Sequence, residues 1–340
     1  MKVKQIVFTR LNTAELIDAE TNAVGDNDVM VKTAVSSISS GTEKANITGN
    51  LSVAGIAPPE KEAHFPRASG YNSAGTVVEV GKNVTHVKIG DRVVVYWGLH
   101  RSYNVVPARQ VVKIEDDNIS FNIGAVCFIG TFPLAAVRKT RVEFGESALV
   151  MGQGLLGQLA VMFMRASGAA PIIAADLVPE RRARARELGA DYALDPREEG
   201  FAAKVKELTH GGVNTCVEVT GVGAGLDGAL DCMAKYGRIA LLGCTRDPNF
   251  TIDYYRKIHC PGIELIGAHT MARPDHESHP GYFTHVDDIK AIMKMHSLGR
   301  VDMSKILAEV HKPEECTEVY TRLVNDPNFP TVTQFDWEKY

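Results

Sequence analysis

Ala148-Leu-Val-Met-Gly152-Gln-Gly154-Leu-Leu-Gly157 carries three glycines at the spacing G-x-G-x-x-G, directly after a short apolar run. The apolar run predicts a buried strand, and residues 155–167 predict a helix. The first glycine of such a loop permits a tight turn, and the second lets the backbone approach a pyrophosphate. The third lets the helix pack close to the sheet, while the amides at the helix start face the phosphates. The segment therefore predicts a dinucleotide-binding loop.

An acidic residue at the end of the next expected strand strengthens this prediction. Asp176 follows Gly157 by 19 residues (157 to 176), the spacing expected for a carboxylate that accepts hydrogen bonds from ribose hydroxyls. A carboxylate there repels a 2′-phosphate, so NAD is expected rather than NADP. The alternatives are that Asp176 only caps the following helix, and that Arg181 and Arg182 hold a phosphate instead of lying on a solvated helix face.

Strand-like and helix-like segments alternate around the glycine loop. Strands are expected at 147–152, 171–177, 213–220, 238–243 and 263–267, with helices at 155–167, 179–188, 201–208 and 226–234. Continuous apolar strands between amphipathic helices indicate a parallel sheet covered on both faces, which binds ligands at the carboxyl ends of its strands. Further cofactor contacts are therefore expected at Leu155, Leu156, Gly221, Gly243 and Ala268. The alternative for the two glycines is an ordinary turn.

The flanking segments have a different character. Residues before about 125 contain short, valine-rich, alternating runs separated by glycines, such as 75–81 and 91–96, which predict an antiparallel β-rich domain. Helices are expected near 286–298 and 313–323, and one more strand near 331–335. The fold class is therefore α/β. Residues 1–128 and 271–340 are expected to form the β-rich domain, into which residues 129–270 are inserted.

Composition and charge exclude several functional classes. The 340 residues are 45% hydrophobic and 23% charged with a net charge of −4, values typical of a soluble two-domain protein and not of a nucleic-acid binder. The least charged long stretch, 155–177, is interrupted by Arg165 and Pro171, so no membrane association is expected. Six scattered cysteines without a C-x-x-C pair and the absence of secretory-signal features predict a cytoplasmic location.

The order of these parts resembles the medium-chain dehydrogenase/reductase superfamily, in particular its zinc-type alcohol and polyol dehydrogenases. The resemblance rests on Ser40-Gly-Thr-Glu43, Gly70-Tyr-Asn-Ser-Ala-Gly75, Gly90-Asp-Arg-Val93, the glycine loop, Leu188-Gly-Ala-Asp191 and Val217-Glu-Val-Thr-Gly221. It implies a GroES-like catalytic domain, an inserted Rossmann domain and an active site between them. It also implies a homodimer or homotetramer formed through the Rossmann domain.

The metal ligands of that superfamily are missing from this sequence. Where zinc members carry a cysteine and a histidine, this chain has Ser40 and Tyr71. Cys127 falls near the position of a third ligand, but a catalytic zinc needs about three protein ligands. His276 and His279 are bracketed by prolines, which favours a loop over a helix face with two ligands. No metal is therefore expected.

Without a metal, side chains must take the proton that leaves a secondary alcohol during hydride transfer. The resemblance places Tyr71 and Ser40 where ligands were lost, and Thr42 where relatives have a hydroxyl that relays protons. His269 follows the last expected strand, near the expected position of the nicotinamide. These four residues are the candidate catalytic groups. The alternatives are that Ser40 and Thr42 cap a helix beginning near Glu43, and that Tyr71 only fills the wall of the cleft.

The expected function is NAD-dependent hydride transfer between nicotinamide and a secondary alcohol or ketone of a sugar, polyol or cyclitol, without catalytic zinc. Polar residues near the candidate groups, among them Ser39, Asn72, His100 and Arg101, favour a polar substrate. Two alternatives stay open. One is a quinone or enoyl reductase of the same superfamily, and the other is a redox sensor that binds NAD(H) without catalysis.

Overall fold

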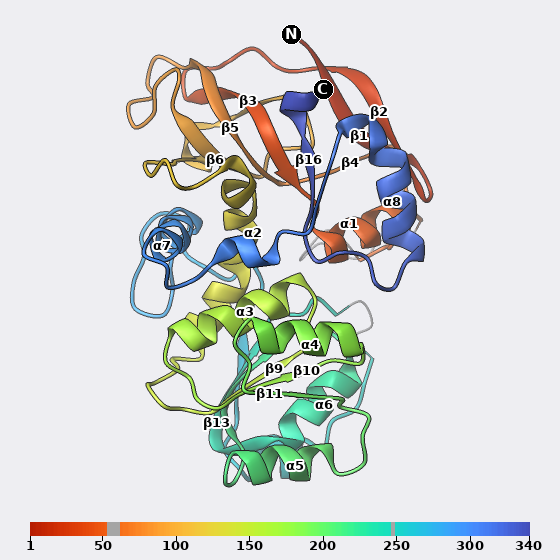
Figure 1. Ribbon diagram of the computed structural model, residues 1–340, viewed down its shortest axis with the longest axis vertical. Helices are drawn as coiled ribbons and strands as arrows, with labels where there is room; N and C mark the ends of the chain where they lie inside the picture. Colours follow the sequence, from red (N-terminus) through yellow and green to blue (C-terminus); the bar gives the residue numbers. More distant parts are fainter. Residues whose placement is uncertain (53–61, 246–248) are drawn as a thin grey trace. The chain divides into compact units, whose positions relative to one another are not determined.

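The computed structural model describes residues 1–52, 62–245 and 249–340, which form two compact units (Figure 1). Unit 1 comprises Met1–Ile129, Met293–Leu298 and Asp302–Tyr340, and unit 2 comprises Gly130–Ile292 and Gly299–Val301. The domain limits expected from the sequence, at residues 129 and 270, stay a prediction. The compact unit 2 continues past residue 270 because Arg273 and Arg138 both pair with the buried Asp288, at 3.2 and 2.8 Å.

Unit 2 is built on a parallel sheet. Its strands are β9 (Ala148–Met151), β10 (Ile172–Ala175), β11 (Tyr192–Leu194), β12 (Val213–Glu218), β13 (Met233–Leu241) and β14 (Glu264–Gly267). They lie in the order β11-β10-β9-β12-β13-β14, so the chain direction across the sheet reverses between β9 and β12. This is the order of a dinucleotide-binding sheet, whose ligands bind at the reversal. The predicted Rossmann-type parallel sheet is therefore confirmed.

Helices cover this sheet between successive strands. They are α3 (Leu155–Ala166), α4 (Pro179–Glu187), α5 (Phe201–Leu208) and α6 (Gly223–Asp231), with a single π-turn at Tyr255–His259. The side chains of α5 and α6 pack with alternate residues of β9 and β10 in one apolar cluster. The helix expected at 226–234 ends earlier, at Asp231. It ends there because Cys232 already accepts a hydrogen bond from the Val213 amide at 2.9 Å, which starts the pairing of β13 with β12.

Two further helices, α2 (Phe121–Lys139) and α7 (His285–Ser297), contribute residues to both units. Helix α2 was not predicted from the sequence. This helix is long and apolar enough to cross a membrane by length and composition, but 78% of its apolar window is buried inside the protein. The core helix of a folded domain has the same properties.

Unit 1 is the β-rich unit. One sheet has the order β2 (Thr13–Glu20), β1 (Lys2–Arg10), β4 (Arg67–Ala68). The other runs β15 (Glu309–His311), β16 (Thr333–Asp336), β3 (Asp28–Ser37), β5 (Asn72–Val80), β6 (Arg92–Tyr96), β8 (Val111–Lys113), with β7 (Tyr103–Pro107) also on β3. Its helices are α1 (Ser40–Ile47) and α8 (Cys316–Asn325), with 3₁₀ turns at Ala108–Gln110, Met303–Ile306, Pro313–Glu315 and Trp337–Lys339. The helix expected near 313–323 is thus a 3₁₀ turn followed by α8.

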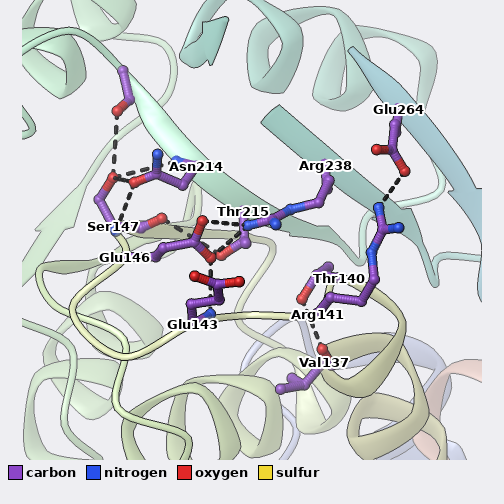
Figure 2. A network of polar contacts seen from close by, with 11 residues as sticks. Val137, Thr140, Arg141, Glu143, Glu146, Ser147, Asn214, Thr215, Arg238 and Glu264 are labelled. Carbon is purple, nitrogen blue, oxygen red and sulfur yellow. Dashed lines mark hydrogen bonds and ion pairs between the residues drawn. The ribbon is translucent and has the colours of Figure 1, made fainter. Parts of the chain in front are cut away.

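A polar network holds the amino ends of the parallel strands in unit 2 (Figure 2). Arg238 on β13 pairs with Glu146 at 2.5 Å. Asn214 on β12 accepts hydrogen bonds from both the amide and the hydroxyl of Ser147, at 3.0 and 2.9 Å. These side chains fix the strands at the end away from the glycine loop, so the loops at the carboxyl ends are the ones that remain for a ligand.

Candidate functional site

The glycine loop has a distinct physical requirement at each glycine. Gly152 has a φ of +96°, which favours glycine at the turn after β9. A Cβ on Gly157 would lie 1.8 Å from the carbonyl oxygen of Gly152, so α3 packs against the loop only without a side chain there. A Cβ on Gly154 would meet no heavy atom within 4 Å, which leaves that backbone open to a ligand. Leu155 and Leu156 follow as the first residues of α3.

Asp176 lies directly after β10, beside the glycine loop. Its Oδ2 accepts a hydrogen bond from the Gln153 amide at 2.6 Å, and its Oδ1 accepts one from the Val178 amide at 2.8 Å. A carboxylate has about four acceptor positions, so two remain for ligand hydroxyls. Asp176 does not cap α4, because Val178 is the N-cap residue of that helix. The structure therefore brings together the loop and the acid that the sequence singled out.

The loops after β12 and β13 meet next to the point where the strand order reverses. A Cβ on Gly243 would lie 2.2 Å from the Gly221 nitrogen, so their backbones touch. Glu218 holds the first of these loops, because its carboxylate accepts from the amides of Thr220 at 2.8 Å and Gly221 at 3.2 Å. Burial raises the pKa of Glu218. Gly221 therefore lies at the reversal point and Gly243 at the end of the neighbouring strand, and both are required by close packing.

The last two predicted residues of unit 2 follow β14. Ala268 is buried, and His269 is half-buried beside it. The segment is held by Lys139 from the last turn of α2, whose Nζ donates to the Gly267 carbonyl at 2.8 Å and to that of Ala272. Burial lowers the pKa of Lys139, and the neighbouring Arg273 lowers it further. The position of His269 is thus set by backbone contacts on both sides of it.

In unit 1, Tyr71 lies among hydroxyl groups. Its hydroxyl donates to Ser39 Oγ and lies 3.5 Å from Thr42 Oγ1. The structure therefore joins two of the predicted residues, but the serine that contacts Tyr71 is Ser39 and not the predicted Ser40. The expected helix is present as α1, but the alternative that Ser40 and Thr42 cap it is wrong, because α1 begins at Ser40 with Ser39 as its N-cap residue.

Aromatic rings surround Tyr71. Its ring centroid lies 5.5 Å from that of Trp97 and 5.9 Å from that of Phe128, and Phe128 stacks on Tyr96 at 5.0 Å. Asn72, paired with Tyr96 in the β5–β6 ladder, is buried, and neither of its amide atoms has a hydrogen-bond partner in the described chain. Buried polar groups are normally satisfied, so Asn72, which was expected only among the polar residues that favour a polar substrate, marks a place for a water or a ligand group.

The buried carboxylate of Glu43 supports this site through hydrogen bonds. Its Oε1 accepts from the Ser39 amide at 2.8 Å, and its Oε2 accepts from His100 Nε2 at 3.1 Å and from the Tyr320 hydroxyl. Burial, followed by the charge of Glu43, raises the pKa of Tyr320 well above its usual value. Three donors thus fix Glu43, and Glu43 in turn fixes the backbone of the residue that contacts Tyr71.

The hydrogen-bond directions in this buried chain follow from the donor that starts it. Trp337 Nε1 only donates, and it lies 2.9 Å from Ser36 Oγ. The Ser36 hydroxyl can then donate to His100 Nδ1 at 2.7 Å, which leaves the His100 proton on Nε2 to face Glu43. The contacts of His100 with Ser36 and Glu43 leave no pattern in the sequence, because these partners are distant from it in the chain.

The residues at the lost ligand positions do not fit a catalytic zinc. Ser40 and Tyr71 offer neutral hydroxyls, whereas zinc prefers thiolate, imidazole and carboxylate. Burial raises the pKa of Cys127 to about 12, and its Sγ lies 3.3 Å from the Ile123 carbonyl oxygen, so it is a core thiol. No cluster of three or more His, Cys, Asp and Glu suited to a metal occurs in residues 1–52, 62–245 and 249–340.

Comparison with known proteins identifies both parts of the chain. Residues 25–116 match the family model for the alcohol dehydrogenase GroES-like domain, and residues 156–280 match that for zinc-binding dehydrogenases. An L-threonine 3-dehydrogenase from Pyrococcus furiosus is 30% identical over 268 residues, covering 68% of this chain and 72% of that protein. D-guloside 3-dehydrogenase from Escherichia coli is 24% identical over 291 residues, covering 80% and 83%.

Solved structures share the whole fold. The 2R,3R-butanediol dehydrogenase of Bacillus subtilis superposes with a TM-score of 0.82 at 23% identity, covering 98% of this chain and 99% of its own. A short chain alcohol dehydrogenase from Escherichia coli, complexed with NADH, gives a TM-score of 0.82 at 17% identity and covers 98% and 99%. A protein from Sinorhizobium meliloti, bound to NADP, gives 0.79 at 18% identity and covers 99% of both chains.

Proposed function

Because this chain belongs to the medium-chain dehydrogenase/reductase superfamily, we propose that it oxidises a secondary alcohol of a sugar, polyol or cyclitol with NAD and without catalytic zinc. It is an oxidoreductase of the alcohol dehydrogenase type, in a family that uses NAD or NADP. Named relatives act on small polar alcohols such as threonine, a guloside and butanediol, which supports the polar substrate.

The observation that carries the choice of NAD is the carboxylate of Asp176. It lies beside the open backbone of Gly154 and keeps acceptor positions for two hydroxyls. The residues present fit a dinucleotide, because the start of α3 offers amides to a pyrophosphate and Asp176 offers oxygens to a ribose. Bound NAD supplies the acceptor for the hydride that leaves the alcohol carbon.

The proton of the alcohol is proposed to leave through the hydroxyl groups around Tyr71. The Tyr71 oxygen can accept the substrate proton while its own proton passes to Ser39 Oγ, toward which it already points, and the Ser39 hydroxyl passes its proton on to water, so that both hydroxyls end neutral. Thr42 Oγ1 offers a second acceptor at 3.5 Å. Glu43 holds the Ser39 amide in place, so this relay keeps its geometry. In this proposal the hydroxyl groups take the proton of the alcohol, and no metal ion is needed at the positions of the lost ligands.

One experiment tests the function and the metal together. The purified protein, treated with a chelator and analysed for metals, is supplied with NAD or NADP and a panel of polyols, sugars, simple alcohols, quinones and enones. Reduced nicotinamide is expected with NAD and a polyol or sugar in metal-free protein. Activity that is lost with the chelator and restored by zinc would refute the metal-free reaction. Turnover of quinones or enones alone would favour a reductase, and binding of NAD without any turnover would favour a redox sensor.

We further propose that the protein forms a homodimer or homotetramer and that it is located in the cytoplasm. Among the residues that the structure describes, strand β14 pairs with β13 alone and has no partner on its other edge, where Leu265 is 38% exposed. Tyr254 and Tyr255, in the segment that precedes β14, are also exposed. Unpaired strand edges and exposed apolar groups favour association. Light scattering after gel filtration should give at least a dimeric mass, and Leu265→Lys should lower that mass.

The proposed cytoplasmic location is supported by the cysteines. All six are free, as is typical of a protein in a reducing compartment.

A further inference from the structure

Asp195, which follows β11, binds two arginines at once. Its Oδ1 accepts from the amide and Nε of Arg197, both at 3.0 Å. Its Oδ2 accepts from Arg197 Nη2 at 2.6 Å and from Arg182 Nη1 at 3.2 Å. The carboxylate itself is buried, with an exposed fraction of 8%. Both guanidinium groups are thus committed to a single acid.

The same two arginines also contact the loop that carries the NAD-selecting acid. Arg182 Nη1 donates to the Asp176 carbonyl oxygen at 2.8 Å, and Arg197 Nη2 donates to the Leu177 carbonyl oxygen at 3.1 Å. Two cations therefore flank the residue whose carboxylate is proposed to bind the adenosine ribose. In a protein that accepted a 2′-phosphate, arginines in this place would be its natural ligands.

The charges of these four residues cancel. Asp176 and Asp195 carry two negative charges, and Arg182 and Arg197 carry two positive ones. Arg197 holds the pKa of Asp195 far below its usual range, so the acid stays charged at every pH of physiological interest. A 2′-phosphate, with a charge of about −1.5 to −2 at neutral pH, therefore meets a cluster of zero net charge in which both arginines already bind a carboxylate.

We propose that Asp195 is a second determinant of cofactor choice, because it keeps Arg182 and Arg197 occupied and so denies them to a 2′-phosphate. The inference rests on the proposed use of NAD at Asp176. Replacement of Asp176 alone removes the repulsion but leaves both arginines bound to Asp195. Replacement of both acids frees two cations beside the ribose position, which turns the same loop into a site for a 2′-phosphate.

Stability alone does not account for this cluster. The side chain of Arg197 is 65% exposed, so solvent screens its ion pair with Asp195 and reduces what that pair contributes to folding free energy. Its bidentate geometry costs side-chain entropy. Arg197 binds Asp195 through both Nε and Nη2, and Arg182 binds it through Nη1, so the arrangement is suited to exclude an anion.

Calorimetric titration with 5′-AMP and 2′,5′-ADP tests the proposal without relying on turnover. The variants are Asp176→Ser, Asp195→Asn and the double variant. Binding of 5′-AMP by the unaltered protein tests the nucleotide site itself, so its failure is separate from failure of the inference. Asp176→Ser should gain at most a few-fold in affinity for 2′,5′-ADP. The double variant should gain about tenfold or more beyond that, since each freed arginine offers a charge-assisted hydrogen bond.

Matched controls separate freed arginines from a simple change in net charge. Glu187→Gln alters the charge equally on the nearby helix α4, where Glu187 pairs with Arg184, and it should not add affinity in the Asp176→Ser background. Arg197→Ala should remove most of the gain of the double variant. Asp195→Asn keeps a side-chain oxygen that accepts from the Arg197 amide. If that variant does not fold, Asp195→Ser takes its place in the experiment, because a serine hydroxyl can also accept from this amide. Equal affinities of Asp176→Ser/Asp195→Asn and Asp176→Ser/Glu187→Gln would overturn the proposal, as would a gain that survives loss of both arginines.

Discussion

The proposed role of Tyr71 depends on its hydroxyl group. Removal of this group leaves the packing of the aromatic ring in place. Tyr71→Phe keeps the contacts with Trp97 and Phe128 but removes the donor to Ser39. The turnover number should fall by roughly 10²–10⁴-fold, while the dissociation constant for NAD stays the same. Steady-state kinetics and a nucleotide titration measure the two quantities.

A second tyrosine of the same aromatic cluster provides the control for that prediction. Tyr96 donates its hydroxyl to the Arg109 carbonyl at 2.6 Å, so Tyr96→Phe removes a hydroxyl from the cluster without touching the relay. It should lower the unfolding temperature and leave the turnover number close to that of the unaltered protein. Equal turnover by the two variants would remove Tyr71 from the relay. Ser39→Ala should likewise reduce turnover more than Ser40→Ala.

The candidate site was predictable residue by residue only where its geometry is local. Asp176 follows from its spacing to the glycine loop, because a strand, a turn and a helix fix where the next strand ends. The pairing of Tyr71 with Ser39 spans 32 residues and depends on the residue at which α1 begins. A shift of one residue along a helix turns a side chain by about 100°, so no sequence pattern separates Ser39 from Ser40. The arginine contacts of Asp195 and the Glu43–His100 pair are tertiary in the same way.

Two glycines in the turn from β9 into α3, Gly154 and Gly157, are expected to respond differently to replacement by alanine. Gly157→Ala places a Cβ 1.8 Å from the Gly152 carbonyl oxygen, where neither backbone can yield cheaply. Gly154 has a φ of −71° and open space around its Cβ position, so alanine fits there. Gly157→Ala should therefore cost on the order of 1–3 kcal/mol or more in unfolding free energy, and Gly154→Ala a few tenths.

Nucleotide binding should separate these two variants in a second way. Gly154→Ala should fold normally and still weaken NAD binding, because its methyl group occupies the side from which a pyrophosphate approaches. Chemical denaturation and a nucleotide titration of both variants measure this. A Gly154→Ala protein that binds NAD as tightly as before would place the pyrophosphate elsewhere.

Elements differed in how well the sequence revealed them. Helices α3 and α5 were predicted nearly to their ends, because each has an apolar pattern next to a clear glycine or strand. Helix α2 was not predicted. It contains Pro133, which normally breaks a helix interior, and it is apolar on most sides, so it lacks the periodicity that identifies an amphipathic helix. Only burial against the surrounding core explains why it forms.

The half-buried histidine at the start of α7 couples the stability of the whole molecule to pH. Burial, followed by the nearby Arg273, lowers the pKa of His285 from 6.5 to about 3. The unfolded chain therefore binds a proton that the folded chain does not, so stability falls as the pH drops from 6.5 toward 3 and is complete above 6.5. The loss by pH 5 is up to about 2 kcal/mol, at roughly 1.4 kcal/mol for each pH unit.

Thermal unfolding between pH 7 and pH 5 tests this dependence. His285→Asn retains a polar group for Thr131, whose hydroxyl lies 2.9 Å from His285 Nδ1, and should flatten the decline in unfolding temperature. His276→Asn changes an exposed histidine and serves as the control, with an unaltered decline. Identical slopes in the two variants would show that His285 is not the coupled group.

The architecture as a whole was accessible from the sequence because alternation of strands and helices is a long, repeated signal. Strand order and the position of the nucleotide loop follow from it. The limits of the compact units were less accessible, since they depend on single buried ions such as Asp288, whose two arginine partners draw the segment after β14 into unit 2.

The pairing of β16 with β3 sets an order of events during synthesis. Gln334 on β16 binds the Ser37 hydroxyl across 297 residues, and Phe335 lies opposite Ser36. At about 5–20 residues per second, a ribosome needs roughly 15–60 s between these two strands. Nearly all of unit 2 emerges within that interval as one continuous stretch. The inserted unit can therefore finish folding first. During this time the end of β3 has one edge without its partner, because β16 has not yet left the ribosome.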